Sequence, residues 1–462
     1  MRIELLAIGL FASGCVASIR PDLDRLEELT AHELPERVAD AVDPVIDGEV
    51  ERTLGRPLTA DAAVRVAIAN NRALRASLRD LGVERGRLLQ AGLLPNPAVE
   101  FDLRQQDDPD QPIQVELYAE YPLTHALLTP MRVEAASHDL SAARYGAAGR
   151  VLETAYEARA AFYAAQAAEQ QLGIALRALE ALAASREAAQ MLFDAGNIPE
   201  LDLATQIAAY EEARATTALI ELEHAEARER LNRALGLHGE ATGWTIAEEL
   251  GPPTDDTLPE TLERDALEAS LELAETRSRL QAVAQRVGLT RTEGWLPDVT
   301  VDVHAEQDGN TWEIGGGASL TVPLFDRREG DTAAYEARFD ALMERYLGLA
   351  IDVRSAARST RNRLLSMRLR ATQYSTVIVP ARRRVFEQTL LQYNAMQVGI
   401  FELITALRMQ MQAELAGVIA LRDYWTARAA LDALLQGRRV GGVTMVGATT
   451  DLGARGASEG GH

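Results

Sequence analysis

The sequence repeats one plan twice, at a spacing of about 200 residues. Asp202 aligns with Glu402 (402 minus 202), and the same offset still aligns Leu235 with Leu435. Further matches are Leu94-Pro95-Asn96 with Leu296-Pro297-Asp298, Tyr121-Pro122-Leu123 with Val322-Pro323-Leu324, and Phe193 with Tyr393. A chain duplicated over this length is expected to fold as two similar halves, so each predicted element has a counterpart.

Each half has the pattern of a helix, two strands, a long helix, a turn and a return helix. The predicted helices are 59–93, 125–193 and 201–235, then 260–292, 329–394 and 401–436; the predicted strands are 97–104 and 113–121, then 298–306 and 312–322. The predicted divisions are a signal peptide 1–14, an N-terminal extension 15–57, a first repeat 58–238, a linker 239–259, a second repeat 260–436 and a disordered tail 437–462. The predicted fold class is therefore mainly α with a small β part.

The predicted strands alternate between apolar and charged residues, which gives each strand two unlike faces. In the strand 113–121, for example, Leu117 and Ala119 share one face and Glu116 and Glu120 share the other. The six acidic residues that the pattern places on the charged faces are Glu100, Asp102, Glu116, Glu120, Asp302 and Glu306. The run Gly315 to Gly317 is interpreted as a place where a strand curves or bulges.

Strands of this kind fit a membrane, but four of them cannot cross one alone. Their length, roughly 10 residues, is what a tilted strand needs to span a bilayer. Open strand edges cost several kcal/mol per unpaired backbone group in lipid, and a closed barrel needs about eight strands. Three copies would supply twelve strands, with the six acidic residues lining a barrel lumen and the apolar faces toward lipid. A half-buried sheet in a soluble protein would show the same alternation.

The long helices also suggest an assembly rather than a compact domain. A helix of about 70 residues spans on the order of 100 Å. One of its faces is rich in alanine (Ala155, Ala158, Ala161, Ala164, Ala165 and Ala168), which allows close helix packing. A rod-like coiled coil without a pore is the alternative, although the sequence keeps no strict heptad over this length.

The N-terminus and the composition place further limits on function. Small residues, Ala12-Ser13-Gly14, precede Cys15, the only cysteine, after a short apolar run. This pattern resembles a bacterial lipoprotein signal, in which Cys15 is lipidated; an ordinary cleaved signal peptide is the alternative. The net charge of −22 argues against a nucleic-acid partner.

The sequence shows no arrangement of residues that would support catalysis or a resident metal ion. The seven histidines are scattered, and no pair has the helical spacing of a zinc site. No serine lies in a nucleophile-elbow context, and no glycine motif precedes a helix as a phosphate-binding loop. We therefore predict no catalytic residue, no cofactor and no metal ligand, and a protein that is not an enzyme.

Taken together, these segments resemble the TolC-like outer membrane factors. The resemblance covers about Leu58 to Leu435 and is carried by "LTADAAVRVAIANNRALRA", "AGLLPNPAVEFDL", "FDAGNIPELDLATQ" and "YNAMQVGIFELITALR". The "LLPNP" segment and the lipoprotein-like start are similar to the branch that serves metal and drug pumps of the resistance-nodulation-division type.

The resemblance implies a homotrimer, with a β-barrel shared by three chains in the outer membrane and a long α-helical barrel in the periplasm. It implies a passive duct that exports small molecules or metal ions, joined by a periplasmic adaptor to an inner-membrane transporter. It also implies an aperture at the helical tips, carried onto Asp202 and Glu402. The family often has a second acidic residue one turn later in the second repeat, where this chain has Thr405.

Two alternative functions remain at this point. One is a duct for type I protein secretion with the same architecture. The other is a structural coiled-coil lipoprotein that forms no pore. The sequence does not identify the exported substrate or the partner pump, and Asp202 and Glu402 could instead be solvated acids in the first turn of a helix, where a carboxylate is favoured by the helix dipole.

Overall fold

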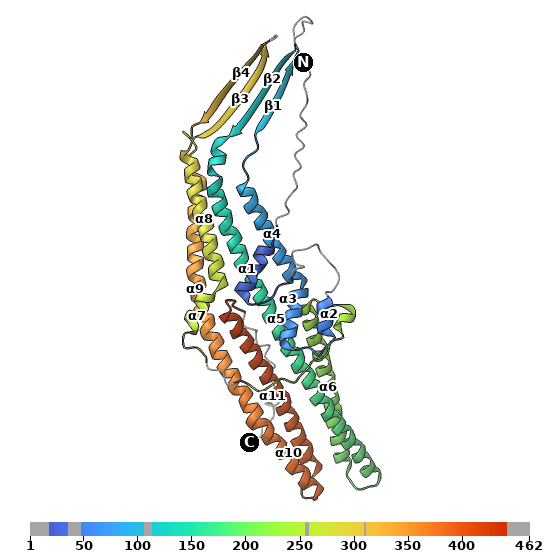
Figure 1. Ribbon diagram of the computed structural model, residues 1–462. Coiled ribbons are helices and arrows are strands. Elements are labelled where there is room, and N and C mark those ends of the chain that lie inside the picture. Colours follow the sequence, from blue (N-terminus) through green and yellow to red (C-terminus); the bar gives the residue numbers. More distant parts are fainter. Residues whose placement is uncertain (1–17, 36–47, 106–112, 255–257, 309–310, 441–462) are drawn as a thin grey trace, which may run out of the picture.

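The protein is elongated, with a small sheet at one end and two helical hairpins at the other (Figure 1). The computed structural model describes residues 18–35, 48–105, 113–254, 258–308 and 311–440; the predicted signal peptide, Cys15 and residues 441–462 of the predicted tail lie outside these ranges. Most of the described chain is helical, so the prediction of a mainly α chain with a small β part is confirmed.

The elements follow the duplicated plan in chain order. An N-terminal helix and a short helix precede the first repeat, and a 3₁₀ turn (Gly239–Thr242) lies in the linker. The bounds are α1 (Arg20–Thr30), α2 (Gly48–Leu54), α3 (Ala60–Asn70), α4 (Arg72–Gly92), β1 (Ala98–Arg104), β2 (Gln114–Pro122), α5 (Leu123–Asp194), α6 (Glu200–Leu235), α7 (Leu262–Ala269), α8 (Leu271–Trp295), β3 (Asp298–Asp308), β4 (Thr311–Thr321), α9 (Glu329–Gln373), α10 (Val379–Asn394) and α11 (Ile400–Leu435).

The four strands form one antiparallel sheet in the order β1-β2-β3-β4. Two hairpins were predicted, one in each repeat, and the structure joins them through β2 and β3, where Glu120 pairs with Asp302. The register between β3 and β4 is continuous from Asp298 to Asp308, through the partners of Gly315 to Gly317. The interpretation of this glycine run as a bulge is therefore wrong.

The first helix of each repeat is broken, which the helical periodicity did not reveal. Asn71 is extended between α3 and α4, and its side-chain oxygen accepts the N–H of Leu74 at 3.1 Å. Ser270 has the same position between α7 and α8, and its Oγ accepts the N–H of Leu273 at 3.3 Å. The single helices predicted over 59–93 and 260–292 are thus wrong, because each contains a second helix start with its own N-cap.

The second long helix contains one irregular turn. Between α9 and α10 the chain forms a π-helical turn, Tyr374–Ile378. Pro380 follows it, and a proline inside a helix lacks an N–H and crowds the carbonyl four residues earlier, so a wider turn relieves the clash. The predicted helix over 329–394 is therefore confirmed, with this interruption.

The core is a set of small residues between long helices. Ala158 and Ala165, from the predicted alanine-rich face of α5, are fully buried, and so is Ala148 of the same helix. They belong to a core cluster that also contains Leu78 and Leu231 from α4 and α6. A second cluster, around Val353 and Tyr424, holds α9 and α11 together in the other repeat. Small side chains let these backbones lie close over the whole length of the molecule.

The linker and the last described residues tie the two repeats together. Trp425 of α11 donates its indole N–H to the carbonyl of Gly251 in the linker (3.0 Å). After α11, Arg438 forms ion pairs with Glu153 of α5 (2.9 Å) and Glu272 of α8 (3.0 Å). The described chain continues to Val440, four residues into the segment 437–462 that was predicted to be a disordered tail.

Candidate functional site

The register of the sheet places all six predicted strand acids on one face. Directly opposed residues of an antiparallel pair project to the same side of the sheet. Asp102 opposes Glu116, Glu116 opposes Glu306, and Glu306 opposes Glu313 of β4. These four carboxylates form a row across the whole width of the sheet, which we call the acidic row. Glu100, Glu120 and Asp302 lie on the same face, nearer the helices.

Three further polar side chains on this face were not singled out from the sequence. Arg104 donates to Asp102 (2.9 Å) and reaches Glu116 (3.4 Å), so it offsets part of the charge of the acidic row. Tyr118 opposes His304, and the His304 Nδ1 lies 3.5 Å from Asp302 Oδ2. Their alternation with apolar residues was visible in the sequence, but only the register shows which of them are neighbours.

The glycines of β4 make room for this polar face. A Cβ atom added at Gly317 would lie 2.8 Å from Asp302 Oδ1, and one added at Gly315 would overlap the imidazole of His304. The side chains of Asp302 and His304 thus lie across the backbone of β4. The glycines thus allow polar side chains of β3 to lie close to the backbone of β4.

The opposite face of the sheet is apolar and exposed. Ile314 is 77% exposed, Val303 61% and Phe101 58%. A water-soluble sheet normally covers such a face with helices, and an uncovered apolar patch marks a surface that meets another protein or a membrane. In the described part of the chain the outer edges of β1 and β4 also have no strand partner.

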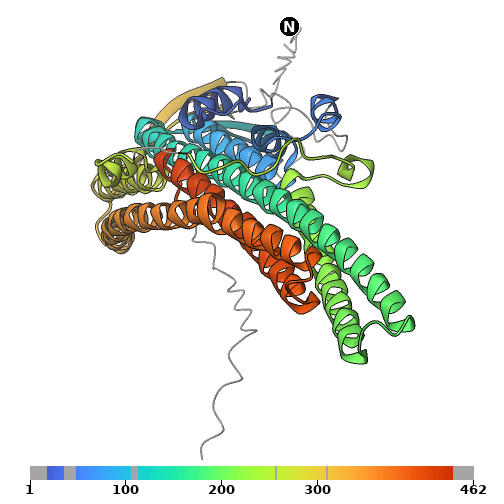
Figure 2. The same ribbon diagram turned by 90° about the horizontal axis from the view of Figure 1, so that it is seen from below.

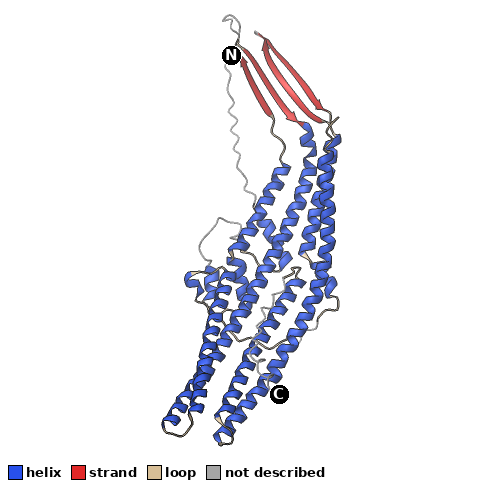
Figure 3. Cartoon of the chain, turned by 180° about the vertical axis from the view of Figure 1, so that it is seen from behind, coloured by secondary structure: helices blue, strands red, loops and turns tan. Residues whose placement is uncertain are grey.

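The predicted aperture residues lie at the opposite end of the molecule. Asp202 is in the first turn of α6 and Glu402 in the first turn of α11, next to the hairpin tips (Figure 3). They are on neighbouring hairpins, seen from the tip end in Figure 2. No hydrogen bond or ion pair joins them among the described residues. One link between these hairpins is an ion pair between Arg408 and Glu212 (2.8 Å).

The hairpins meet through a small apolar cluster near the tips. Ile404 of α11 packs with Leu182 of α5 and with Ala209 and Ala213 of α6. A surface groove of 390 Å³ lies along α10 and α11 beside Glu402. The acids at the tips are thus exposed or half-buried side chains on a lightly packed part of the protein.

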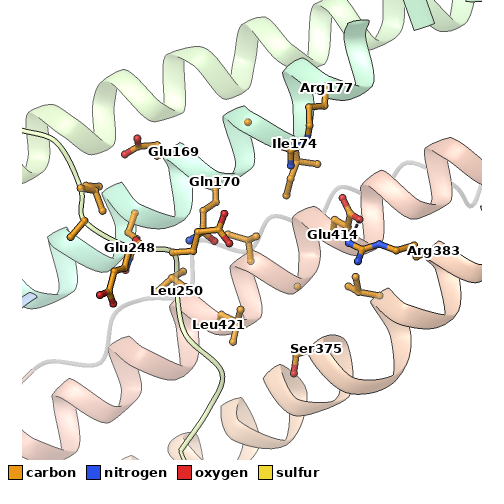
Figure 4. A pocket seen from close by; sticks show the side chains of 18 residues that line it. Glu169, Gln170, Ile174, Arg177, Glu248, Leu250, Ser375, Arg383, Glu414 and Leu421 are labelled. Atoms are coloured by element: carbon orange, nitrogen blue, oxygen red, sulfur yellow. Dashed lines mark hydrogen bonds and ion pairs between the residues drawn. The ribbon is translucent and has the colours of Figure 1, made fainter. Parts of the chain in front are cut away.

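A further cavity lies away from both sites. It measures 520 Å³, is open to the surface, and is lined by α5, the linker, the π-helical turn, α10 and α11 (Figure 4). An ion pair between Arg383 and Glu414 (3.1 Å) lies at one side, and the buried Nε2 of Gln170 makes no hydrogen bond. Its lining mixes both charges with apolar side chains, so it does not point to one ligand class.

Two further observations concern metal ligands and helix hydropathy in the described residues. No group of three or more His, Cys, Asp or Glu in them could hold a metal ion. None of the described helices combines the length and the hydropathy that a membrane crossing requires.

Comparison with known proteins extends these observations. No family model matches the chain. The cobalt-zinc-cadmium resistance protein CzcC of Cupriavidus metallidurans is 25% identical over 394 residues, which cover 83% of this chain and 91% of CzcC. The CmeC outer membrane channel of Campylobacter jejuni has the same fold, with a TM-score of 0.69 at 13% identity over 88% of this chain and 93% of CmeC.

A second solved structure leads to the same fold. The open state of the MtrE outer membrane channel of Neisseria gonorrhoeae matches with a TM-score of 0.63 at 18% identity, over 82% of this chain and 89% of MtrE. CmeC and MtrE are outer membrane channels, and CzcC is a metal resistance protein. Along most of its length this chain thus has the fold of the solved outer membrane channels and is similar in sequence to CzcC.

Proposed function

We propose that this chain is the outer membrane channel of a tripartite efflux system. Three copies would pool their sheets into one β-barrel in the outer membrane and their long helices into a duct in the periplasm. The observation that carries the proposal is the pair of unlike sheet faces, an exposed apolar face opposite the acidic row. A sheet with lipid on one side and a water-filled lumen on the other needs this distribution.

The unpaired edges of β1 and β4 support a barrel shared between copies. Four strands cannot close on themselves, since about eight are the practical minimum. Three sheets placed edge to edge would pair every outer edge and give twelve strands, in which the six predicted acids and Glu313 would line the lumen. Directly opposed like charges are unfavourable in a sheet. Water in a wide lumen would reduce this repulsion.

The acidic row favours cations as cargo. In a trimer the row would become a ring of carboxylates that raises the local concentration of cations at the lumen wall. The relative CzcC is named for resistance to cobalt, zinc and cadmium. We therefore propose divalent metal cations as cargo, moved passively, with an inner-membrane transporter of the resistance-nodulation-division type and a periplasmic adaptor as partners.

Asp202 and Glu402 are proposed to surround the periplasmic opening. Their places at the hairpin tips support this role, because three copies would bring six carboxylates to one end of the duct. The lipidation of Cys15 would add an anchor in the outer membrane and stays a prediction.

The experiment is purification from membranes followed by planar-bilayer recording. The proposal expects extraction only with detergent, a stable trimer, and a conducting pore with a preference for cations. Replacing the acidic row with neutral amides (Asp102→Asn, Glu116→Gln, Glu306→Gln and Glu313→Gln) should reduce the cation preference and leave the trimer intact. A protein released by cleaving the lipid anchor alone, without conductance, would instead indicate a structural lipoprotein. Export of a protein substrate through the pore would indicate type I secretion.

A further inference from the structure

Arg104 brings a positive charge to the otherwise acidic polar face of the sheet. The described strands contain no lysine and no second arginine, whereas the six predicted acids and Glu313 all lie on this face. Arg104 is the last residue of β1, at the end of the sheet that points away from the helices (Figure 1). In the proposed channel this end is the outer one, toward which the cargo would leave.

The guanidinium of Arg104 folds back onto the acidic row. Its Nε donates to Asp102 Oδ2 at 3.1 Å, and its Nη2 lies 2.9 Å from the same oxygen and 3.4 Å from Glu116 Oε2. Asp102 and Glu116 are directly opposed on β1 and β2. Opposed like charges in a sheet repel each other. The positive charge thus lies beside two carboxylates that the strand register holds close together.

The other half of the acidic row has no such countercharge. Glu306 of β3 and Glu313 of β4 are also directly opposed, and neither forms an ion pair within the part of the chain that the structure describes. With Arg104 the row has a net charge of −3 per copy (−4 + 1), and without it −4. A single side chain therefore changes the charge of the whole row by a quarter.

Holding the sheet together is not a sufficient role for this arginine. The Arg104 side chain is 65% exposed, and those of Asp102 and Glu116 are 40% and 39% exposed. Ion pairs this exposed contribute little to stability, because water screens the charges and both side chains lose conformational freedom. The main effect of the Arg104 charge is on the electrostatic potential of the water beside the acidic row.

We infer that Arg104 is a specificity-determining residue of the channel, which weakens the negative potential of the acidic row so that cations are attracted there and still released. The inference rests on the proposed function, because it needs water and passing ions on the polar face. Passage requires attraction that is strong enough for entry and weak enough for exit. Because the energy of an ion is proportional to its charge, Arg104 would act more strongly on divalent than on monovalent cations.

The test measures the potential beside Arg104 with charged thiol reagents on the full-length protein in lipid vesicles. Gln114 lies directly opposite Arg104 on β2, so Gln114→Cys places a thiol there. The measured quantity is the ratio of the modification rates for a cationic and an anionic methanethiosulfonate. Arg104→Gln should raise this ratio about threefold, because the loss of a charge roughly 6 Å away changes the energies of the two reagents in opposite directions. The protein without Gln114→Cys gives the background from Cys15.

Two matched variants separate the charge of Arg104 from its shape. Arg104→Lys should keep the ratio of the unaltered arginine, since it keeps the charge without the planar guanidinium. Adding Asp102→Asn to Arg104→Gln should bring the ratio back, because the row again has three net negative charges per copy (−4 + 1 from the added neutral amide). A ratio that Arg104→Gln leaves unchanged would overturn the inference.

Planar-bilayer recording connects this potential to ion selectivity. In a KCl gradient, the reversal potential of the Arg104→Gln channel should move toward the equilibrium potential of K⁺, and Arg104→Lys should leave it in place. A raised thiol ratio with an unchanged reversal potential would refute the role in specificity while leaving the channel function standing. If neither reagent reached the thiol of Gln114→Cys, the polar face would not line a water-filled lumen, and the proposed function would fail as well.

Discussion

A single arginine on the apolar face of the sheet should distinguish lipid from water as the environment of that face. Val303 is the middle residue of β3, which runs from Asp298 to Asp308. At about 3.3 Å per residue this strand is ~36 Å long, and a tilt of 35–45° reduces its height to ~25–30 Å, the height of the apolar band of a membrane barrel. Val303 would then lie near the midplane.

The free-energy cost of Val303→Arg differs between a lipid-facing and a water-exposed sheet. Arginine at the midplane of a lipid-facing strand costs about 2–4 kcal/mol, so three copies of Val303→Arg would cost ~6–12 kcal/mol per trimer. On a water-exposed sheet the same substitution at a largely exposed position would change stability by about 0.5 kcal/mol or less. The cost in lipid is comparable with the total free energy of unfolding of many proteins, about 5–15 kcal/mol.

His304→Arg is the matched control, because it adds the same side chain one residue further on, at the opposite face. It places a cation near Asp302 and lies over Gly315, where there is no side chain to displace. The assay is the fraction of each variant that reaches the outer membrane as a trimer, followed by urea titration after folding into lipid vesicles. Equal assembly of Val303→Arg and His304→Arg would refute the assignment of the apolar face to lipid.

Four other changes test parts of the structure by thermal or urea denaturation in detergent or by bilayer recording. Asn70→Ala should cost about 1–3 kcal/mol, because the Asn70 amide donates to the carbonyls of Leu235 and Gly236 at the end of α6. Gly437→Ala should cost about 1–3 kcal/mol or more, because φ is +103° there and the added Cβ would overlap the Ala269 carbonyl. Glu275→Gln should raise stability at neutral pH, since burial raises the pKa of the Glu275 carboxyl above its ordinary value. This gain should disappear as the pH falls through that raised pKa, where the folded protein already protonates Glu275. Asp202→Ala with Glu402→Ala should increase single-channel conductance if these acids surround the opening, and unchanged conductance would contradict that role.

The duplication made most of the fold predictable. A period of two identified all four strands within a few residues, and a helical period identified the long helices, because both patterns are regular over many residues. The breaks at Asn71 and Ser270 were missed since each lies inside a continuous helical pattern. Each new helix start depends on an N-cap hydrogen bond to the side chain of Asn71 or Ser270. Asn71 also donates its side-chain N–H to the carbonyl of Ala234 (3.0 Å), which is far away in the sequence.

In the candidate site, too, the sequence pattern predicted the face of each residue, but only the paired strands show which residues are neighbours. Alternation alone placed six acids on the charged faces of their strands. It could not show that Asp102, Glu116, Glu306 and Glu313 form one row, because that depends on how β2 pairs with β3 across the two repeats. It also could not show why β4 is rich in glycine. The answer lies in the side chains of Asp302 and His304 on the neighbouring strand.

The sheet and the helical body differ in how strongly they require assembly. In the sheet, the unpaired edges of β1 and β4 demand partners wherever water is excluded, because backbone groups there cannot be left unbonded. In the helical body water is present, so nothing forces α6 and α9 to find partners, and specificity must come from side chains. Hydrogen bonding between strand edges in the membrane is thus the stronger constraint on how copies of this chain would combine.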